Sequence, residues 1–90
     1  MRIKGLCWDD ANIEHLARHG VDPVEIEDVC FGKHISFRGH RRRYILYGKT
    51  EGGRMIMVVL ERLSGQVFRP ITAREMTESE RHSYRRRAGE

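Results

Sequence analysis

Arginine side chains are the groups of this sequence whose type and number most clearly suggest a chemistry. Fourteen of the seventeen cationic residues are Arg, whose planar guanidinium binds phosphate oxygens in pairs and stacks on nucleobases. Residues 33–90 carry fourteen Lys or Arg against six acidic residues, whereas residues 1–32 carry three against seven. A nucleic acid is therefore the expected partner, in preference to a membrane. The alternative is a basic surface that only keeps the domain soluble.

Aromatic side chains are interleaved with these cations. In single-stranded RNA complexes, bases stack on aromatic rings while Arg pairs with phosphates, so this interleaving favours an RNA-binding surface. For any one Arg a solvated position is the simpler explanation, but for the group it is not. The group consists of the cations Arg41, Arg42, Arg43, Lys49, Arg54, Arg62, Arg69, Arg74, Arg81, Arg85, Arg86 and Arg87 and the aromatic residues Tyr44, Tyr47, Phe68 and Tyr84.

The histidines and cysteines give no strong indication of a metal site. His15 and His19 are four residues apart, a spacing that suits a metal on one helix face, but no local pattern supplies a third ligand. We therefore predict two polar histidines on a helix surface, with no metal and no cofactor. Cys7 and Cys30 are too few for a disulfide framework and are expected to fill the core of a protein of the reducing cytoplasm.

Local signals predict two helices near the N-terminus and one at the C-terminal end. An aspartate at position 9 or 10 can cap the first helix. Asp22 and Glu25 form a capping box for the second. Thr77 and Glu80 form the same motif at the start of the third. The predicted helices cover about residues 10–19, 23–31 and 78–87.

Between the second and third helices the apolar period changes from 3.6 to 2, which predicts strands. Residues 55–60 are apolar on both faces, so their strand should be central. Pro70 has no amide donor, which predicts an edge position or a bulge. A regular strand would place Arg69 and Arg74 on opposite faces, but a bulge at Pro70 could bring both to one side. The predicted strands cover residues 2–8, 34–38, 41–48, 54–63 and 66–74, with a tight turn at Gly39–His40.

These elements predict one α+β domain over residues 1–90, a twisted antiparallel sheet with two N-terminal helices and one C-terminal helix. Ninety residues are too few for two cores. With 39% hydrophobic residues the chain is unlike a disordered one. No apolar run approaches the ~20 residues of a membrane helix, and the N-terminus lacks the apolar region of a signal peptide. The expected setting is the cytoplasm.

Several stretches together resemble a known family. They are Trp8-Asp9, Leu16-Ala17-Arg18-His19-Gly20-Val21, Arg43-Tyr44-Ile45-Leu46-Tyr47-Gly48, Arg69-Pro70-Ile71-Thr72-Ala73-Arg74-Glu75-Met76-Thr77 and Glu80-Arg81 with Tyr84. Their pattern is similar to that of BrnT-type toxins, the ribonuclease components of type II toxin–antitoxin pairs. The resemblance covers the chain from Trp8 to Tyr84. It implies a RelE-like fold, metal-independent RNA cleavage, and neutralisation by a co-encoded antitoxin in heterotetramers built on an antitoxin dimer.

The resemblance also implies roles for individual residues. RNA cleavage without a metal needs a group that takes the 2′-hydroxyl proton, cations for the pentavalent phosphorane and a donor for the leaving oxygen. By resemblance, Arg69 and Arg74 hold the scissile phosphate. His19 is either the base or a histidine that caps its helix. Tyr84, Lys49 and Arg54 are candidates for proton handling or substrate orientation, and Arg43 and Arg81 for substrate binding.

Two other functions stay open from the sequence. One is a non-catalytic nucleic-acid-binding module that uses the same basic surface. The other is a protein-interaction domain whose edge strand near Pro70 docks a partner. A nuclease and a binding module both predict affinity that falls steeply with salt, but only the nuclease predicts RNA with new ends.

Overall fold

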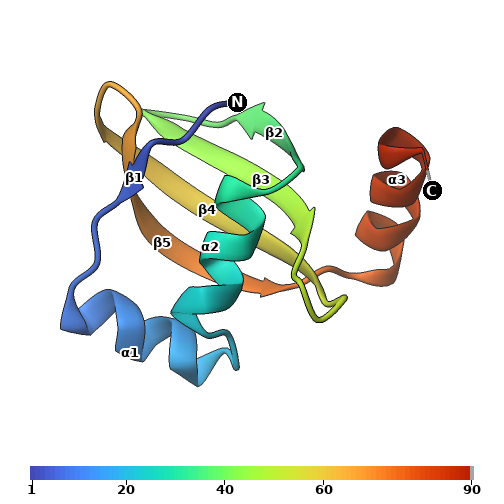
Figure 1. The fold of residues 1–90 in the computed structure, drawn as a ribbon, viewed down its shortest axis with the longest axis horizontal. Coiled ribbons are helices and arrows are strands. Elements are labelled where there is room, and N and C mark those ends of the chain that lie inside the picture. The colour runs from blue at the N-terminus through green and yellow to red at the C-terminus, as the bar shows by residue number, and fades with distance from the viewer. Residues whose placement is uncertain (90) are drawn as a thin grey trace.

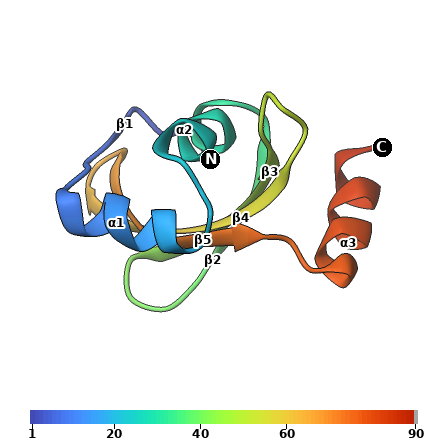
Figure 2. The same cartoon turned by 90° about the horizontal axis from the view of Figure 1, so that it is seen from below.

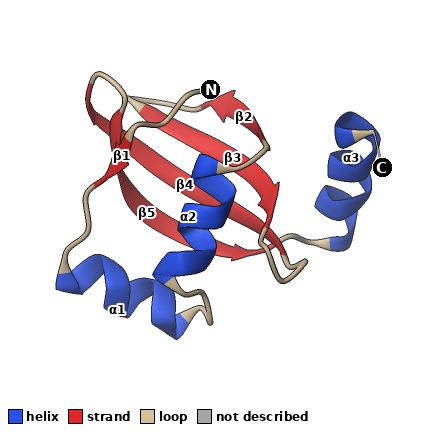
Figure 3. Ribbon diagram, in the orientation of Figure 1, coloured by secondary structure: helices blue, strands red, loops and turns tan. Residues whose placement is uncertain are grey.

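The computed structural model describes residues 1–89, and its elements follow the predicted order (Figures 1 and 3). Each boundary except those of the first strand and the second hairpin strand lies within one residue of its expected place. The elements are β1 (Gly5–Leu6), α1 (Asp10–Arg18), α2 (Pro23–Phe31), β2 (His34–Arg38), β3 (Arg43–Lys49), β4 (Met55–Ser64), β5 (Val67–Glu75) and α3 (Glu78–Ala88).

The strands form one sheet in the order β1-β5-β4-β3-β2, with the apolar β4 at its centre as predicted. Strands β2 to β5 are antiparallel, joined by short turns. The prediction of an antiparallel sheet misses one feature, because β1 runs parallel to β5. A parallel pair needs a long crossover, and here the connection contains α1, α2 and three strands. The sheet is therefore mixed within an α+β fold.

The first strand is shorter than predicted. Only Gly5 and Leu6 stand opposite β5, and the chain then turns away to begin α1. Leu6 and Trp8 pack against the core, so the intervening Cys7 points away from it and is exposed. The prediction that Cys7 fills the core is therefore wrong, whereas Cys30 is buried as expected.

Capping residues set the helix starts. Asp9 accepts a 2.8 Å hydrogen bond from the backbone N–H of Asn12 at the start of α1. At α2, the backbone N–H of Asp22 donates to the Glu25 carboxylate at 3.1 Å. At α3, Thr77 and Glu80 exchange hydrogen bonds of 2.9 and 3.2 Å. Each motif satisfies backbone donors that have no partner inside the helix, which explains why local sequence located these ends.

The sheet separates two groups of apolar side chains. On one face, residues such as Leu46, Val58 and Phe68 pack with α1 and α2. In Figure 2, α2 lies over this face, α1 runs beside β5, and α3 stands beyond the end of β5. On the opposite face a smaller group joins Met57 to Met76 and Tyr84 near α3. We call this second face, which points away from α2, the outer face.

A bulge in β5 decides which arginines share the outer face. Val59 stands opposite Thr72 and Leu60 stands opposite Pro70, so Ile71 is the extra residue. Of the two alternatives predicted at Pro70, an edge position or a bulge, the structure has the bulge. Because one residue is added between them, Arg69 and Arg74 point to the same side of the sheet.

The turn between β2 and β3 is longer than predicted, and the strand expected from position 41 begins at Arg43. Arg41 and Arg42 have φ angles of 52° and 59°, which the tight hairpin requires of its two central residues. The Arg42 guanidinium donates to the backbone oxygens of Arg62 and Leu63 at 3.0 and 3.1 Å, which fixes the turn on β4. Among residues 1–89, no helix is both long and apolar enough to pass through a membrane.

Candidate functional site

Strand register places the polar residues of the outer face in rows that run across the sheet. Paired residues of adjacent strands lie about 4.8 Å apart, and successive rows about 7 Å apart along the strands. The rows are Arg43–Glu61–Arg69, then Phe37–Ile45–Val59–Thr72, then Ile35–Tyr47–Met57–Arg74. We call the first of them the arginine row. The rows bring together residues from β2 to β5 that are far apart in the sequence.

The arginine row places a carboxylate between two cations. Arg69 donates from Nη2 to Oε1 of Glu61 at 2.8 Å, and Arg43 stands directly across from Glu61 on the other side. The Arg69 side chain is 42% exposed, yet its Nε is buried and has no partner among the described residues. The row therefore offers guanidinium groups to solvent, spaced on both sides of a group that can take a proton.

Arg74 lies two rows away and is held by α3. Its Nη1 and Nη2 donate to the two carboxylate oxygens of Glu80 at 2.7 and 3.1 Å. The Tyr47 hydroxyl also donates to this carboxylate, at 3.3 Å. We call these three residues the α3 clasp. The pKa of Glu80 is lowered to about 2, mainly by the hydrogen bonds from Arg74 and also by those from Thr77 and Tyr47 and by the charge of Arg74. The pKa of Tyr47 is raised, first by burial and then by the charge of Glu80.

The histidines of α1 reach the outer face at Thr72. His15 Nε2 lies 3.1 Å from the Thr72 hydroxyl oxygen, and the rings of His15 and His19 are 4.8 Å apart. His19 itself is exposed and occupies the C-cap position of α1. Within residues 1–89, no three His, Cys, Asp or Glu side chains gather closely enough to hold a metal ion. Of the pair that sequence spacing singled out, His15 contacts a hydroxyl of the sheet and His19 contacts the His15 ring.

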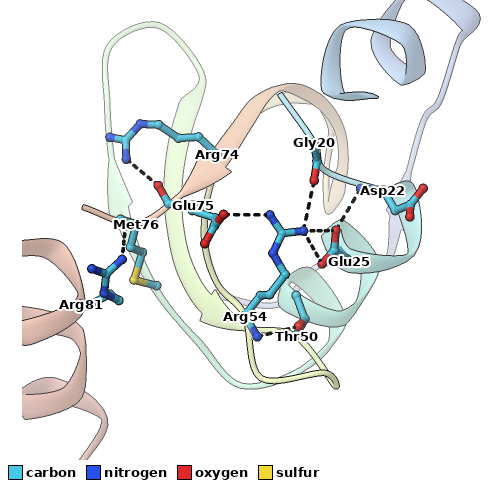
Figure 4. Close-up of polar contacts among 9 residues, drawn as sticks. All are labelled: Gly20, Asp22, Glu25, Thr50, Arg54, Arg74, Glu75, Met76 and Arg81. Atoms are coloured by element: carbon cyan, nitrogen blue, oxygen red, sulfur yellow. Dashed lines mark hydrogen bonds and ion pairs between the residues drawn. The ribbon is translucent and has the colours of Figure 1, made fainter. Parts of the chain in front are cut away.

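Arg54 lies apart from the outer face and joins α2 to the end of β5 (Figure 4). Its Nη1 donates to both Glu25 oxygens at 2.8 Å and to the backbone oxygen of Gly20 at 3.1 Å. Its Nη2 lies 3.3 Å from Oε2 of Glu75. Arg54 is thus surrounded by oxygen atoms of the protein, and this arrangement ties the helices to the sheet.

The remaining predicted residues lie near α3. Tyr84 is 5% exposed and packs with Met57 and Met76. Arg81 donates to the backbone oxygen of Met76 at 2.7 Å (Figure 4), and Lys49 ends β3. Met57 and Glu61 are four residues apart in β4, or ~13 Å. Tyr84 is therefore at the other end of the outer face from the arginine row.

Sequence reasoning missed Glu61, Thr72 and His15 as members of the site. The available signal for Glu61 was a single acid at the end of an otherwise apolar run. Its position between Arg43 and Arg69 depends on the register of three strands, which local sequence does not specify. Thr72 and His15 meet only because α1 packs along β5.

The fold is similar to that of a solved protein. The crystal structure of the Brucella abortus ribonuclease toxin BrnT, at 1.1 Å resolution, superposes with a TM-score of 0.67 at 19% sequence identity. The match covers 82% of this chain and 97% of that one. It shows that the α+β fold is shared. No curated protein matches the sequence.

Sequence places the chain within a particular family. The family model described as the ribonuclease toxin, BrnT, of type II toxin–antitoxin systems matches residues 8–80. The chain therefore belongs to the BrnT ribonuclease toxin family, as the resemblance of its motifs predicted. Its family implies an antitoxin as partner.

Proposed function

We propose that this chain is a toxin that cleaves RNA on the outer face of its sheet without a metal ion. The observation that carries the proposal is the arginine row, in which register places Glu61 between Arg43 and Arg69. Family membership supplies the reaction class. The row supplies cations for a phosphate and a group that accepts a proton, which this chemistry requires.

In the proposed reaction the 2′-hydroxyl attacks the adjacent phosphorus. The bond from the 2′-oxygen to phosphorus forms and the bond from phosphorus to the 5′-oxygen breaks, which leaves a 2′,3′-cyclic phosphate and a 5′-hydroxyl. Arg69 and Arg43 hold the phosphate oxygens and stabilise the charge of the phosphorane. Glu61 takes the proton of the 2′-hydroxyl. The incoming phosphate replaces Glu61 as the partner of Arg69, which frees the carboxylate for this step.

His15 is the proposed donor of a proton to the leaving 5′-oxygen. Its Nε2 is held at Thr72, which stands one row from Glu61 in the adjacent strand, or about 7 to 8 Å away on the diagonal. An imidazole ring nitrogen can donate a proton. His19 contacts the His15 ring and orients it. Glu61 and His15 thus lie on either side of the phosphate that Arg69 binds.

The other predicted residues take supporting roles in this proposal. Arg74 binds the RNA backbone two rows from the scissile phosphate once Glu80 releases its guanidinium. The predicted residues beside α3 remain candidates for substrate orientation, namely Tyr84, Lys49 and Arg81. Arg54 has a structural role, since its guanidinium contacts Glu25, Glu75 and Gly20.

The antitoxin is proposed to inhibit by covering the outer face in a heterotetramer, and the reaction is placed in the cytoplasm. A protein that exposes this many arginines binds RNA non-specifically. A partner with acidic segments that pair with the arginine row would prevent both binding and cleavage. Co-expression of the adjacent gene should therefore protect RNA from cleavage.

The test is cleavage of single-stranded RNA by the purified chain, with the ends of the products identified. The wild-type chain should leave cyclic phosphate ends, and EDTA should not change its rate. Arg69→Ala and Glu61→Gln should each lower the rate by ~10²-fold or more. The exposed Arg2 and Glu27 give matched controls, and Arg2→Ala and Glu27→Gln should cleave normally. His15→Ala should lose activity that free imidazole restores, whereas His82→Ala should not.

Three results would contradict the proposal. Full activity of both Arg69→Ala and Glu61→Gln would remove the arginine row from the reaction. Salt-dependent RNA binding by the wild-type chain with no new RNA ends would favour a non-catalytic binding module. Loss of activity in EDTA with recovery in Mg²⁺ would refute the metal-independent mechanism.

A further inference from the structure

A cavity of about 250 Å³ opens between α3 and the outer face. It lies at the β2 end of the sheet, where the second and third rows of the outer face terminate. Residues of three elements line it: Ile35 and Phe37 of β2, Tyr47 of β3, and Ser79, Glu80, Ser83, Tyr84 and Arg87 of α3. None of the proposed chemical steps uses this cavity.

The apolar part of the cavity includes the accessible aromatic ring of Phe37. Phe37 is 40% exposed, and its ring meets that of Tyr47 edge to face at a centroid distance of 5.9 Å. The Arg87 guanidinium lies over the Phe37 ring, 5.2 Å from its centroid. An aromatic face beside an arginine is the usual surface for an unpaired nucleobase, because the ring stacks on the base and the cation adds attraction.

The polar part of the cavity comes from one side of α3. Ser79 and Ser83 are one turn apart and supply hydroxyls that both donate and accept. A cavity with apolar walls and a few convergent polar groups is the form that small-molecule sites take. The two serine hydroxyls can hydrogen-bond the edge of a base that stacks on Phe37, and this gives a means of sequence preference.

We propose that this cavity binds one unpaired nucleobase of the RNA substrate. This proposal rests on the proposed function, which gives RNA as the polymer whose base enters the cavity. Phe37 belongs to the row next to the arginine row, and adjacent rows are about 7 Å apart. The base in the cavity therefore belongs to a nucleotide beside the scissile phosphate, and the cavity selects the site of cleavage.

The experiment uses a short 2′-O-methyl RNA, which lacks the hydroxyl that attacks and so cannot be cleaved. 2-Aminopurine replaces one base at a time along the RNA, and its fluorescence and the anisotropy of an end label are titrated with the full chain. At one position the fluorescence should be quenched by stacking. Phe37→Ala should abolish this quenching and weaken binding by about 5- to 100-fold, while Phe37→Tyr should retain both.

The matched control is Phe31, which is 52% exposed at the end of α2 on the other side of the sheet. Phe31→Ala should change neither quenching nor affinity. Circular dichroism of each variant confirms that the fold is kept. On cleavable RNA, Phe37→Ala should alter which positions are cut, whereas Phe31→Ala should not.

The outcomes separate this proposal from the proposed function. If the wild-type chain quenches 2-aminopurine but cleaves no RNA, the base site stands and the nuclease assignment fails. If RNA is cleaved and Phe37→Ala changes neither affinity nor the positions of cleavage, the base site is refuted alone. If Phe37→Ala weakens capture of the antitoxin and leaves RNA binding unchanged, the cavity binds the partner protein and this proposal is overturned.

Discussion

Substitution of Glu80 by Gln should weaken the attachment of α3 to the sheet. The Glu80 carboxylate receives both guanidinium bonds of Arg74 and the hydroxyl of Tyr47, and it also caps the helix through Thr77. Gln keeps the shape and an acceptor oxygen for the cap. Its amide NH2 cannot accept from Arg74 Nη2 or from the Tyr47 hydroxyl, so the variant removes both the charge and two hydrogen bonds of the clasp.

The magnitude follows from the pKa of Glu80, which falls from its ordinary value of 4.5 to about 2 because of Arg74 above all. Each pKa unit corresponds to about 1.36 kcal/mol, which sets a ceiling of about 3 kcal/mol. The Arg74 side chain is 43% exposed, so water screens the pair and reduces its contribution. We expect Glu80→Gln to lower the free energy of unfolding by about 1 to 2 kcal/mol at neutral pH.

The pH dependence has a defined sign. The folded state holds this proton less readily than the unfolded chain does, so the stabilisation is fully present above about pH 4.5 and is lost as the pH falls toward about 2. Urea unfolding followed by circular dichroism at neutral pH and near the lower limit measures both values. The difference between wild type and Glu80→Gln should shrink in acid.

The control for this experiment is Glu78, an exposed acid in the same first turn of α3. Glu78→Gln removes the same charge from the helix N-terminus and should cost no more than about 0.5 kcal/mol. Equal losses in Glu78→Gln and Glu80→Gln would mean that only the helix dipole matters. An unchanged stability of Glu80→Gln at neutral pH would refute the clasp.

Two further predictions concern the packing of α2. A methyl group on Gly48 would lie 2.8 Å from Cγ1 of Val29, so Gly48→Ala should destabilise the fold by about 1 to 3 kcal/mol in urea unfolding. Gly52→Ala should not destabilise the fold, because the nearest atom to its added methyl group is 3.8 Å away. Equal stabilities of Gly48→Ala and Gly52→Ala would show that α2 shifts to accommodate the methyl group at no cost. Burial and the charge of Glu27 raise the pKa of the Cys30 thiol to about 12, so iodoacetamide should modify Cys7 alone in the native state, and two adducts by mass spectrometry would contradict this.

The sequence by itself determined the helices, the order of the strands along the chain and an edge position or a bulge at Pro70. Capping at Asp22 and Thr77 depends on residues within one turn, and the missing amide of Pro70 is a local fact. Apolar residues on both faces of β4 required a central strand. Motifs spread from Trp8 to Tyr84 also sufficed to indicate the family, which the family model then showed over residues 8–80.

Only the tertiary structure decided which cations share a surface. Arg69 faces Glu61 and Arg43 because of the register of β3, β4 and β5, whereas Arg54 turns to the side of α2 and contacts Glu25 and Glu75. The local sequence predicts that Arg69 and Arg54 are both basic residues of strands. Their separation arises from pairing between distant segments, since a shift of one residue in register moves every side chain to the other face.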